Sequence, residues 1–117
     1  MKRVLTLALC AFCAAPAAAF DGRYVAGTKA YSQELTIGKS SDGSFSVEAL
    51  VATKGCTGAA TAQGHAQGET LVATATQDGE TCTLTLSRKA GRLLLEEEHC
   101  LYFHGAACEF AGAYRKR

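Results

Sequence analysis

Apolar and polar residues alternate with a period of two along most of the chain, and this alternation constrains the possible folds more than any other feature of the sequence. In residues 81–86 it is strict, because three threonines separate one cysteine and two leucines. The pattern recurs in three further runs, 31–37, 44–52 and, more weakly, 70–76. Because successive side chains of a strand point to opposite faces of a sheet, the alternation predicts half-buried β-strands.

Turn signals that contain glycine divide these runs at intervals of roughly 8–12 residues. They are Asp42-Gly43, Gln67-Gly68, Asp78-Gly79 and Ala90-Gly91, and Asp-Gly in particular favours hairpin turns because both residues tolerate a positive φ. The spacing predicts an all-β fold, a small antiparallel meander barrel of about eight strands, with a β-sandwich as the alternative. The expected strands cover residues 23–28, 31–38, 44–53, 58–66, 69–77, 80–88, 91–98 and 108–115.

Three parts of this assignment have alternatives. Residues 59–66 contain only small or polar side chains, so a loop is the alternative to a strand. Residues 92–101 contain good helix formers, but a helix would place three consecutive glutamates on its apolar stripe, which favours a strand. Gly-x-Tyr occurs at Gly22 and again at Gly112. Pairing of these two segments would close the sheet without a free edge, although a glycine-rich chain also repeats such a tripeptide by chance.

Residues 1–19 have the pattern of a secretory signal peptide. A positively charged start precedes an apolar stretch of twelve residues, 4–15, and a proline then stands before three alanines. We expect cleavage between Ala19 and Phe20, which leaves residues 20–117 as a single β domain. Twelve apolar residues are too few to span a bilayer. We therefore expect a periplasmic or secreted protein without a membrane span.

Four cysteines remain after this cleavage, and an even number in a small exported domain predicts two disulfides. Four cysteines allow three pairings. The sequential pairing, Cys56–Cys82 and Cys100–Cys108, needs no long crossing and is the one we expect. The main alternative is Cys82–Cys100, because a hairpin turn at residues 90–91 would bring these two residues together.

Residues 99–108 hold the densest group of reactive side chains, and a metal site or a catalytic pair are alternatives to a disulfide there. His99, Cys100, His104 and Cys108 offer the nitrogen and thiolate ligands that zinc takes, and a Cys–His pair can act as a nucleophile. An oxidising compartment removes free thiolates, however, and the spacing matches no C-x₂-C metal motif. We therefore expect neither a metal nor a cofactor.

Other signs of catalysis or of nucleic-acid binding are weak. The sequence has no G-x-S-x-G, P-loop, dinucleotide-binding or H-E-x-x-H motif. Glu96, Glu97 and Glu98 offer an acid–base pair, but a solvated face is the simpler interpretation. A formal net charge of +1 gives no basic footprint for nucleic acid. We therefore expect a protein that is not an enzyme and has no nucleic-acid partner.

A loop closed between Cys100 and Cys108 would display Tyr102, Phe103 and His104 as candidate binding residues. Aromatic side chains on a rigid loop make good interface anchors, because little conformational entropy is left to lose on binding. The alternative is that Tyr102 and Phe103 fold inward and plug one end of the barrel. The basic ending at residues 115–117 either contacts an anionic partner or solubilises the terminus.

Signal peptide, size, strand meander and disulfides together resemble the small periplasmic β-barrel proteins of Gram-negative bacteria, among them the c-type lysozyme inhibitors. Those inhibitors insert a Ser-Gly-x-x-Tyr-type segment into the lysozyme cleft, and the nearest segments here, 21–24 and 111–114, lack the serine. The Cys-x₃-His-Gly-x₂-Cys-x-Phe-x-Gly-x-Tyr-Arg ending is also similar to that of small exported bacterial proteins.

The resemblance implies a monomeric binding or inhibitor-like module whose partner is an envelope protein or a glycan, with a lysozyme among the candidates. A lipocalin-like binder of a small apolar ligand is the alternative, and it requires an interior cavity.

Overall fold

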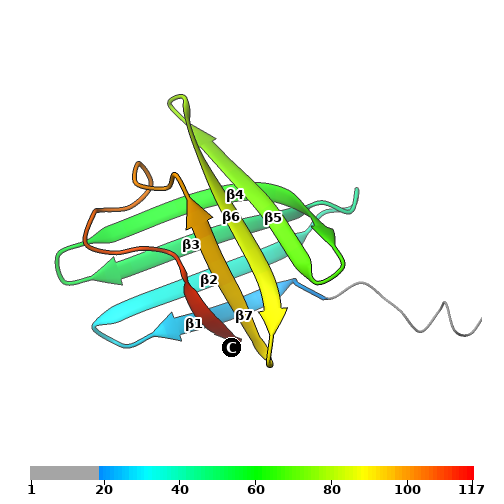
Figure 1. The fold of residues 1–117 in the computed structure, drawn as a ribbon, viewed down its shortest axis with the longest axis horizontal. Coiled ribbons are helices and arrows are strands. Elements are labelled where there is room, and N and C mark those ends of the chain that lie inside the picture. Colours follow the sequence, from blue (N-terminus) through cyan, green and yellow to red (C-terminus); the bar gives the residue numbers. More distant parts are fainter. Residues whose placement is uncertain (1–18) are drawn as a thin grey trace, which may run out of the picture.

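The computed structural model describes residues 19–117, and this part of the chain contains eight antiparallel strands (Figure 1). Each strand pairs with its neighbours in sequence, as predicted for a meander barrel. The strands are β1 (Gly22–Gly27), β2 (Tyr31–Lys39), β3 (Phe45–Thr53), β4 (Thr57–Gln67), β5 (Thr70–Gln77), β6 (Glu80–Lys89), β7 (Arg92–Glu98) and β8 (Gly112–Lys116). The predicted signal peptide falls, except for its last residue, outside the described residues.

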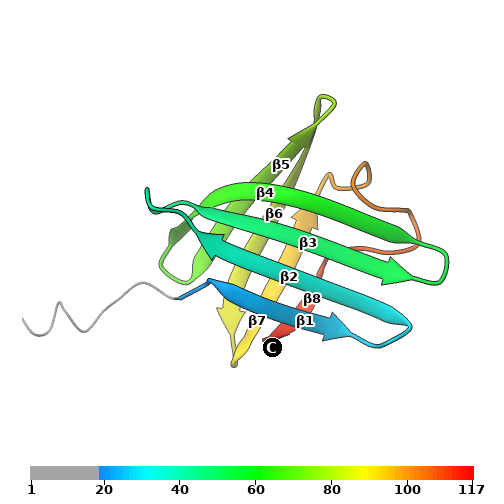
Figure 2. The same ribbon diagram turned by 180° about the vertical axis from the view of Figure 1, so that it is seen from behind.

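The barrel closes because β8 pairs with β1, which confirms the expectation from the repeated Gly-x-Tyr. Tyr24 lies opposite Lys116, and Val25 lies opposite Arg115. β1 to β4 run across the view of Figure 1 while β5 to β7 cross them steeply, and the reverse view in Figure 2 shows β8 beside β1. Among residues 19–117 no helix is long and apolar enough to cross a membrane.

Two of the predicted turns are tight hairpins with two successive positive φ values. Asp78 and Gly79 join β5 to β6 with φ values of 52° and 82°, and Ala90 and Gly91 join β6 to β7 with 49° and 78°. Two successive positive φ values match the right-handed twist of the strands they connect. The Asp-Gly signal therefore marked its turn correctly, and at the second turn an alanine adopts the same strained region.

β4 curves across the barrel, and part of its edge has no strand neighbour (Figure 2). Gly64 pairs with Phe45 of β3 on one side and with Ala73 of β5 on the other. A Cβ atom at Gly64 would lie 1.9 Å from the carbonyl oxygen of Val72, so only glycine fits here. β5 pairs with residues 63–67 alone. The first half of β4 thus has β3 on one edge and no strand on the other.

The inward side chains of the strands form one buried apolar cluster. Its largest fully buried members are Tyr114, Phe20, Phe110, Leu35, Leu71, Leu84, Leu86, Leu93, Leu95 and Val47. On β4 the inward positions are alanine and glycine, and at Gly64 the backbone of the neighbouring β5 approaches too closely for any side chain. Leucines of β6 and β7 fill the remaining width of the barrel.

Both disulfides differ from the sequential pairing, which was wrong. The structure joins Cys82 to Cys100, with 4.6 Å between the Cα atoms, and Cys56 to Cys108, with 6.0 Å. In the β6–β7 register Thr83 lies opposite Glu98, so Cys100 leaves β7 beside Cys82. Cys56 lies in the β3–β4 turn, and β5 stands between β4 and β6 in the sheet. Cys56 is therefore not beside Cys82 of β6. Two disulfides are typical of proteins outside the reducing cytoplasm.

Candidate functional site

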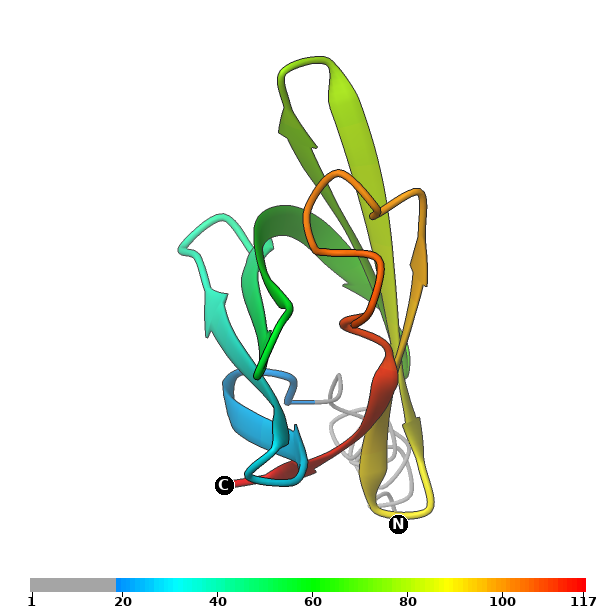
Figure 3. The same ribbon diagram turned by 90° about the vertical axis from the view of Figure 1, so that its left-hand side faces the viewer.

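Residues 99–111, called the anchored segment below, connect β7 to β8 without regular structure of their own. Cys100 ties the start of the segment to β6, and Cys108 ties its far part to the β3–β4 turn. Figure 3 looks onto this end of the barrel and shows the segment, in orange to red, running from β7 down to β8. Here β8 begins at Gly112 rather than at residue 108, because the preceding residues belong to the segment.

The anchored segment occupies the edge of β4 that has no strand neighbour. Gly58 and His104 form a β-bridge. The Ala59 amide donates to the Phe103 carbonyl at 3.0 Å, and the Gly105 amide donates to the Thr57 carbonyl at 3.2 Å. A Cβ atom at Gly58 would lie 2.3 Å from the Cβ of His104. The glycine therefore allows the close approach that the bridge needs.

Glu97 is the centre of a polar network beneath the segment. It continues the inward face that Leu93 and Leu95 define on β7, and its side chain is 13% exposed. One carboxylate oxygen accepts the backbone amides of Phe110, at 2.7 Å, and Ala111, at 3.1 Å. The other faces the Nε2 atom of His104 at 2.6 Å. Glu97 is therefore a half-buried structural acceptor and not part of a solvated face.

His104 has hydrogen-bond acceptors at both ring nitrogens. Nε2 faces Glu97, and Nδ1 lies 2.7 Å from the Gly105 carbonyl oxygen. A neutral imidazole carries only one N–H, so both contacts are satisfied when the ring is protonated. Burial lowers the pKa of His104, but its hydrogen bonds to Glu97 and Gly105 and the nearby carboxylates of Glu97 and Glu109 outweigh burial and leave the pKa above its usual value.

Two side chains of β2 hold the far end of the anchored segment. Gln33 is buried, and its Nε2 donates to the carbonyls of Glu109 and Ala111, each at 2.9 Å. The Tyr31 hydroxyl accepts the Glu109 amide at 2.9 Å. Together with Glu97 and the disulfides, these contacts bind the segment to β2, β4, β6 and β7.

The three predicted binding residues have different positions in this segment. Phe103 and His104 are buried, with 7% and 9% of their surface exposed, whereas Tyr102 is 49% exposed. The Tyr102 hydroxyl donates to the carboxylate of Asp78 at the β5–β6 turn. Leu101 was not among the predicted binding residues, and it is 71% exposed. Its position next to a predicted disulfide cysteine was the available signal.

Beside the segment, an acidic cleft of about 520 Å³ is lined by Thr85, Glu96, Glu97, Glu98, Glu109 and Ala111. Within residues 19–117 no group of histidine, cysteine or carboxylate side chains is arranged to hold a metal ion. Cys100 and Cys108 are oxidised and offer no thiolate. His104 uses both ring nitrogens within the fold, so its pair with Glu97 has no free nitrogen for a substrate.

Comparison with family models, curated proteins and solved structures gives no match to this chain.

The two Gly-x-Tyr segments, 21–24 and 111–114, are built into the core. Tyr24 is 3% exposed and Tyr114 is 0% exposed. The Tyr24 hydroxyl donates to the carbonyl of Phe20, and the Tyr114 hydroxyl donates to that of Phe110, each at 2.7 Å. Burial raises the pKa of Tyr114. Neither tyrosine can enter a partner's cleft without leaving the barrel.

Proposed function

We propose that this protein is a non-enzymatic periplasmic or secreted module that binds an envelope protein or a glycan, in the manner of an inhibitor. The anchored segment carries the binding surface, with Leu101 and Tyr102 as its apolar contacts. The observation that supports this assignment is an exposed apolar pair on a segment that two disulfides and a buried polar network hold in place.

Rigidity matters because binding normally orders the groups at an interface. Leu101 and Tyr102 lie between two fixed residues. Cys100 precedes them and is disulfide-bonded to β6, and Phe103 follows them and is hydrogen-bonded to β4. Tyr102 packs edge to face on Phe103, with ring centroids 5.6 Å apart. A partner therefore meets side chains that are already positioned, and the entropy lost on association is small.

The lipocalin-like alternative has no comparable support. The inward positions of the barrel are occupied by one continuous cluster of leucine, valine, alanine and aromatic side chains. An apolar ligand in the interior would have to displace these side chains. Among the described residues, the exposed apolar pair that favours recognition, Leu101 and Tyr102, lies on the anchored segment and not inside the barrel.

A binding panel tests the proposal. The purified protein is titrated by calorimetry against lysozymes of different classes and against solubilised cell-wall glycans, and the best partner is retested with the double variant Leu101→Ser and Tyr102→Ser. We expect the double variant to weaken binding by about 10–100-fold, because two central apolar contacts are lost.

The matched control is Leu50→Ser with Val72→Ser, which removes two apolar side chains that are 41% and 45% exposed on the barrel wall. This control should leave binding unchanged. A panel without any complex, or an equal loss in both double variants, would refute the role of the anchored segment.

A further inference from the structure

Seven of the ten lysine and arginine residues in 19–117 gather at the end of the barrel opposite the acidic cleft. This basic end consists of Arg23, Arg88, Lys89, Arg92, Arg115, Lys116 and Arg117. Strand pairing brings them together: Lys89 lies opposite Arg92, Arg115 lies opposite Val25, and the Arg117 amide donates to the Arg23 carbonyl. Four adjacent strands, β6, β7, β8 and β1, thus contribute to one basic surface.

Five of these cations point away from the core. Because Leu93, Tyr114 and Tyr24 are buried on their strands, the neighbouring Arg92, Arg115 and Arg23 lie on the outer face, as do Lys89 and Arg117 by the same alternation. All five are exposed. The structure describes one ion pair in residues 19–117, between His104 and Glu97, so none of the five is neutralised by a carboxylate there.

The other two cations turn toward the mouth of the barrel. The Arg88 guanidinium lies over the Phe20 ring at 5.3 Å, and the Lys116 ammonium lies over the Tyr24 ring at 5.5 Å. Two acidic residues lie close by, and each contacts the basic end through its backbone carbonyl: Asp21 accepts from Lys116, and Glu69 accepts from the Arg88 amide. Positive charge therefore predominates at this end.

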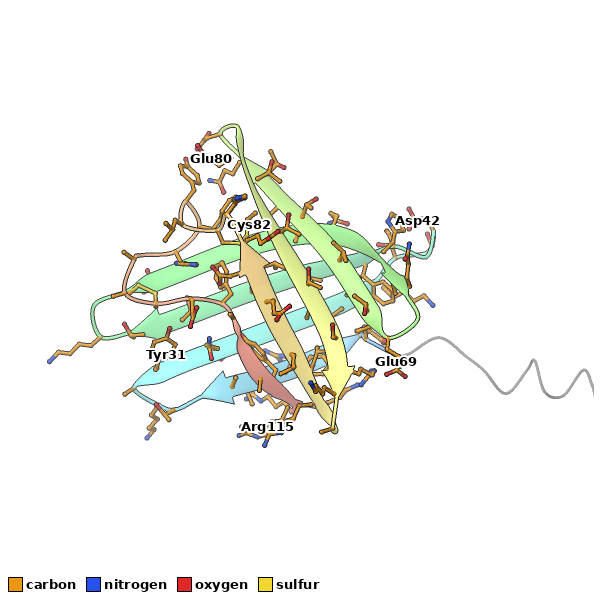
Figure 4. All side chains as sticks on the ribbon, viewed as in Figure 1. Tyr31, Asp42, Glu69, Glu80, Cys82 and Arg115 are labelled. Atoms are coloured by element: carbon orange, nitrogen blue, oxygen red, sulfur yellow. A yellow bond between two sulfur atoms is a disulfide. The ribbon has the colours of Figure 1, made fainter. Side chains whose placement is uncertain are left out.

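The opposite end is acidic, so the molecule is strongly dipolar. Six of the eleven carboxylates lie there: Asp78, Glu80, Glu96, Glu97, Glu98 and Glu109. β7 alone carries Arg92 at one end and Glu98 at the other, about 20 Å apart. In Figure 4, Arg115 lies at the lower edge of the molecule and Glu80 at the upper edge. The small net charge hides this separation.

The exposed, unpaired cations of the basic end indicate what kind of anion it meets. The acidic cleft, a second pocket beside the anchored segment and two pockets on the outer walls of β2–β3 and β4–β5 are all lined by other residues. A flat anionic surface needs no groove, because exposed, unpaired cations on adjacent strands can contact it directly. Several lysines and arginines close to such a surface are attracted to it together.

We propose that the basic end docks the protein onto the anionic phospholipid headgroups of a bilayer. The dipole sets the orientation, with the acidic end and the anchored segment pointing away from the membrane. Attachment of this kind is peripheral and reversible, because it depends on long-range charge attraction that salt screens. This inference does not depend on the partner that the anchored segment binds.

Vesicle sedimentation tests the proposal. Purified protein is mixed with vesicles of phosphatidylcholine alone or with increasing phosphatidylglycerol, at low and at high sodium chloride. We expect binding that rises with the phosphatidylglycerol fraction and falls with salt. The triple variant Lys89→Gln, Arg92→Gln and Arg115→Gln should lower the partition coefficient at least about tenfold.

The chain offers a control with the same change in net charge. Lys29→Gln, Lys39→Gln and Lys54→Gln remove the three cations that are not among these seven. Lys39 lies nearest to the basic end, through the Phe45 and Phe20 rings, so this variant should lose much less binding than the variant of the basic end. Equal losses in the two triple variants would overturn the proposal. So would a protein that binds a soluble polyanion such as dextran sulfate but no vesicle, since a glycan would then be the partner of the basic end. The vesicle experiment is independent of the binding panel. If the anchored segment bound no partner in that panel, the expected vesicle binding would be the same.

Discussion

At the scale of single residues, His104 and Glu97 explain how an irregular segment remains fixed. The histidine bridges a β7 carboxylate and the Gly105 carbonyl, and the same carboxylate accepts two backbone amides. Charged hydrogen bonds of this kind contribute more than neutral ones, and losing one partner leaves the others buried without compensation. These two residues therefore contribute to the stability of the fold and not to a binding surface.

Stability should therefore depend on the ionisation of His104. The pKa of this histidine is raised in the folded protein above its unfolded value, so its contribution is complete below that unfolded value, about 6.5. It is lost as the pH rises through the folded pKa, because the folded protein then releases its proton. Urea unfolding between about pH 5 and about pH 9 should show the free energy of unfolding falling along this alkaline limb.

The variant His104→Gln should lack this limb and should be less stable at acidic pH. His65→Gln is the control, because it removes an exposed histidine and should retain this alkaline limb. A parent protein whose stability rises with pH across this range would contradict the assigned role of His104.

At the scale of strands and loops, sequence patterns predicted regular structure well and non-local pairing poorly. Alternation and glycine-containing turns located β2, β3, β5 and β6, because each depends on neighbours within about ten residues. The other four strands were expected on weaker signals, such as the repeated Gly-x-Tyr of β1 and β8. The last strand was predicted to begin at residue 108, four residues before the observed start of β8. Gln33 and Glu97, which belong to other strands, hold the residues in between. The same reason explains the disulfide error. Which cysteines meet depends on the register of β6 with β7. The alternative pairing expected from the hairpin turn at residues 90–91, Cys82–Cys100, is the one that the structure shows.

The two disulfides should contribute unequally. Cys56–Cys108 spans 52 residues of sequence and Cys82–Cys100 spans 18, and loop entropy assigns them about 4 and about 3 kcal/mol. The pair of substitutions Cys56→Ser and Cys108→Ser should therefore lower the free energy of unfolding more than Cys82→Ser with Cys100→Ser. Urea denaturation measures both, and peptide mapping without reductant checks the pairing. A reversed order of the two losses would argue against the loop-entropy account.

At the scale of the whole molecule, the barrel closes through two equivalent segments. Phe20 precedes Tyr24 by four residues, as Phe110 precedes Tyr114, and both phenylalanines are fully buried. The sequence therefore repeats Phe-x-Gly-x-Tyr on the two strands that meet, and each tyrosine hydroxyl closes onto its own phenylalanine carbonyl. The Gly-x-Tyr part was visible in the sequence. Its structural purpose was not, because nothing local distinguishes a buried tyrosine from one on a binding loop.

The equivalence of the two segments predicts matched effects. Tyr24→Phe and Tyr114→Phe should each lower the free energy of unfolding by about 1 kcal/mol, because each leaves one buried carbonyl without its hydrogen bond. Thermal or urea unfolding of the two variants gives the comparison. Tyr102→Phe, at an exposed position, should change stability by less than about 0.5 kcal/mol. A large effect at only one of the two buried sites would show that the segments are not equivalent.

The pairing of Cys56 with Cys108 turns nearly half of the chain into a covalent ring. Any single cut of the backbone within that ring, whether in the β5–β6 hairpin or in the anchored segment, opens the ring without separating its parts. A protease that reaches these exposed loops would therefore divide the polypeptide and still leave one molecule, whose two pieces come apart only after reduction.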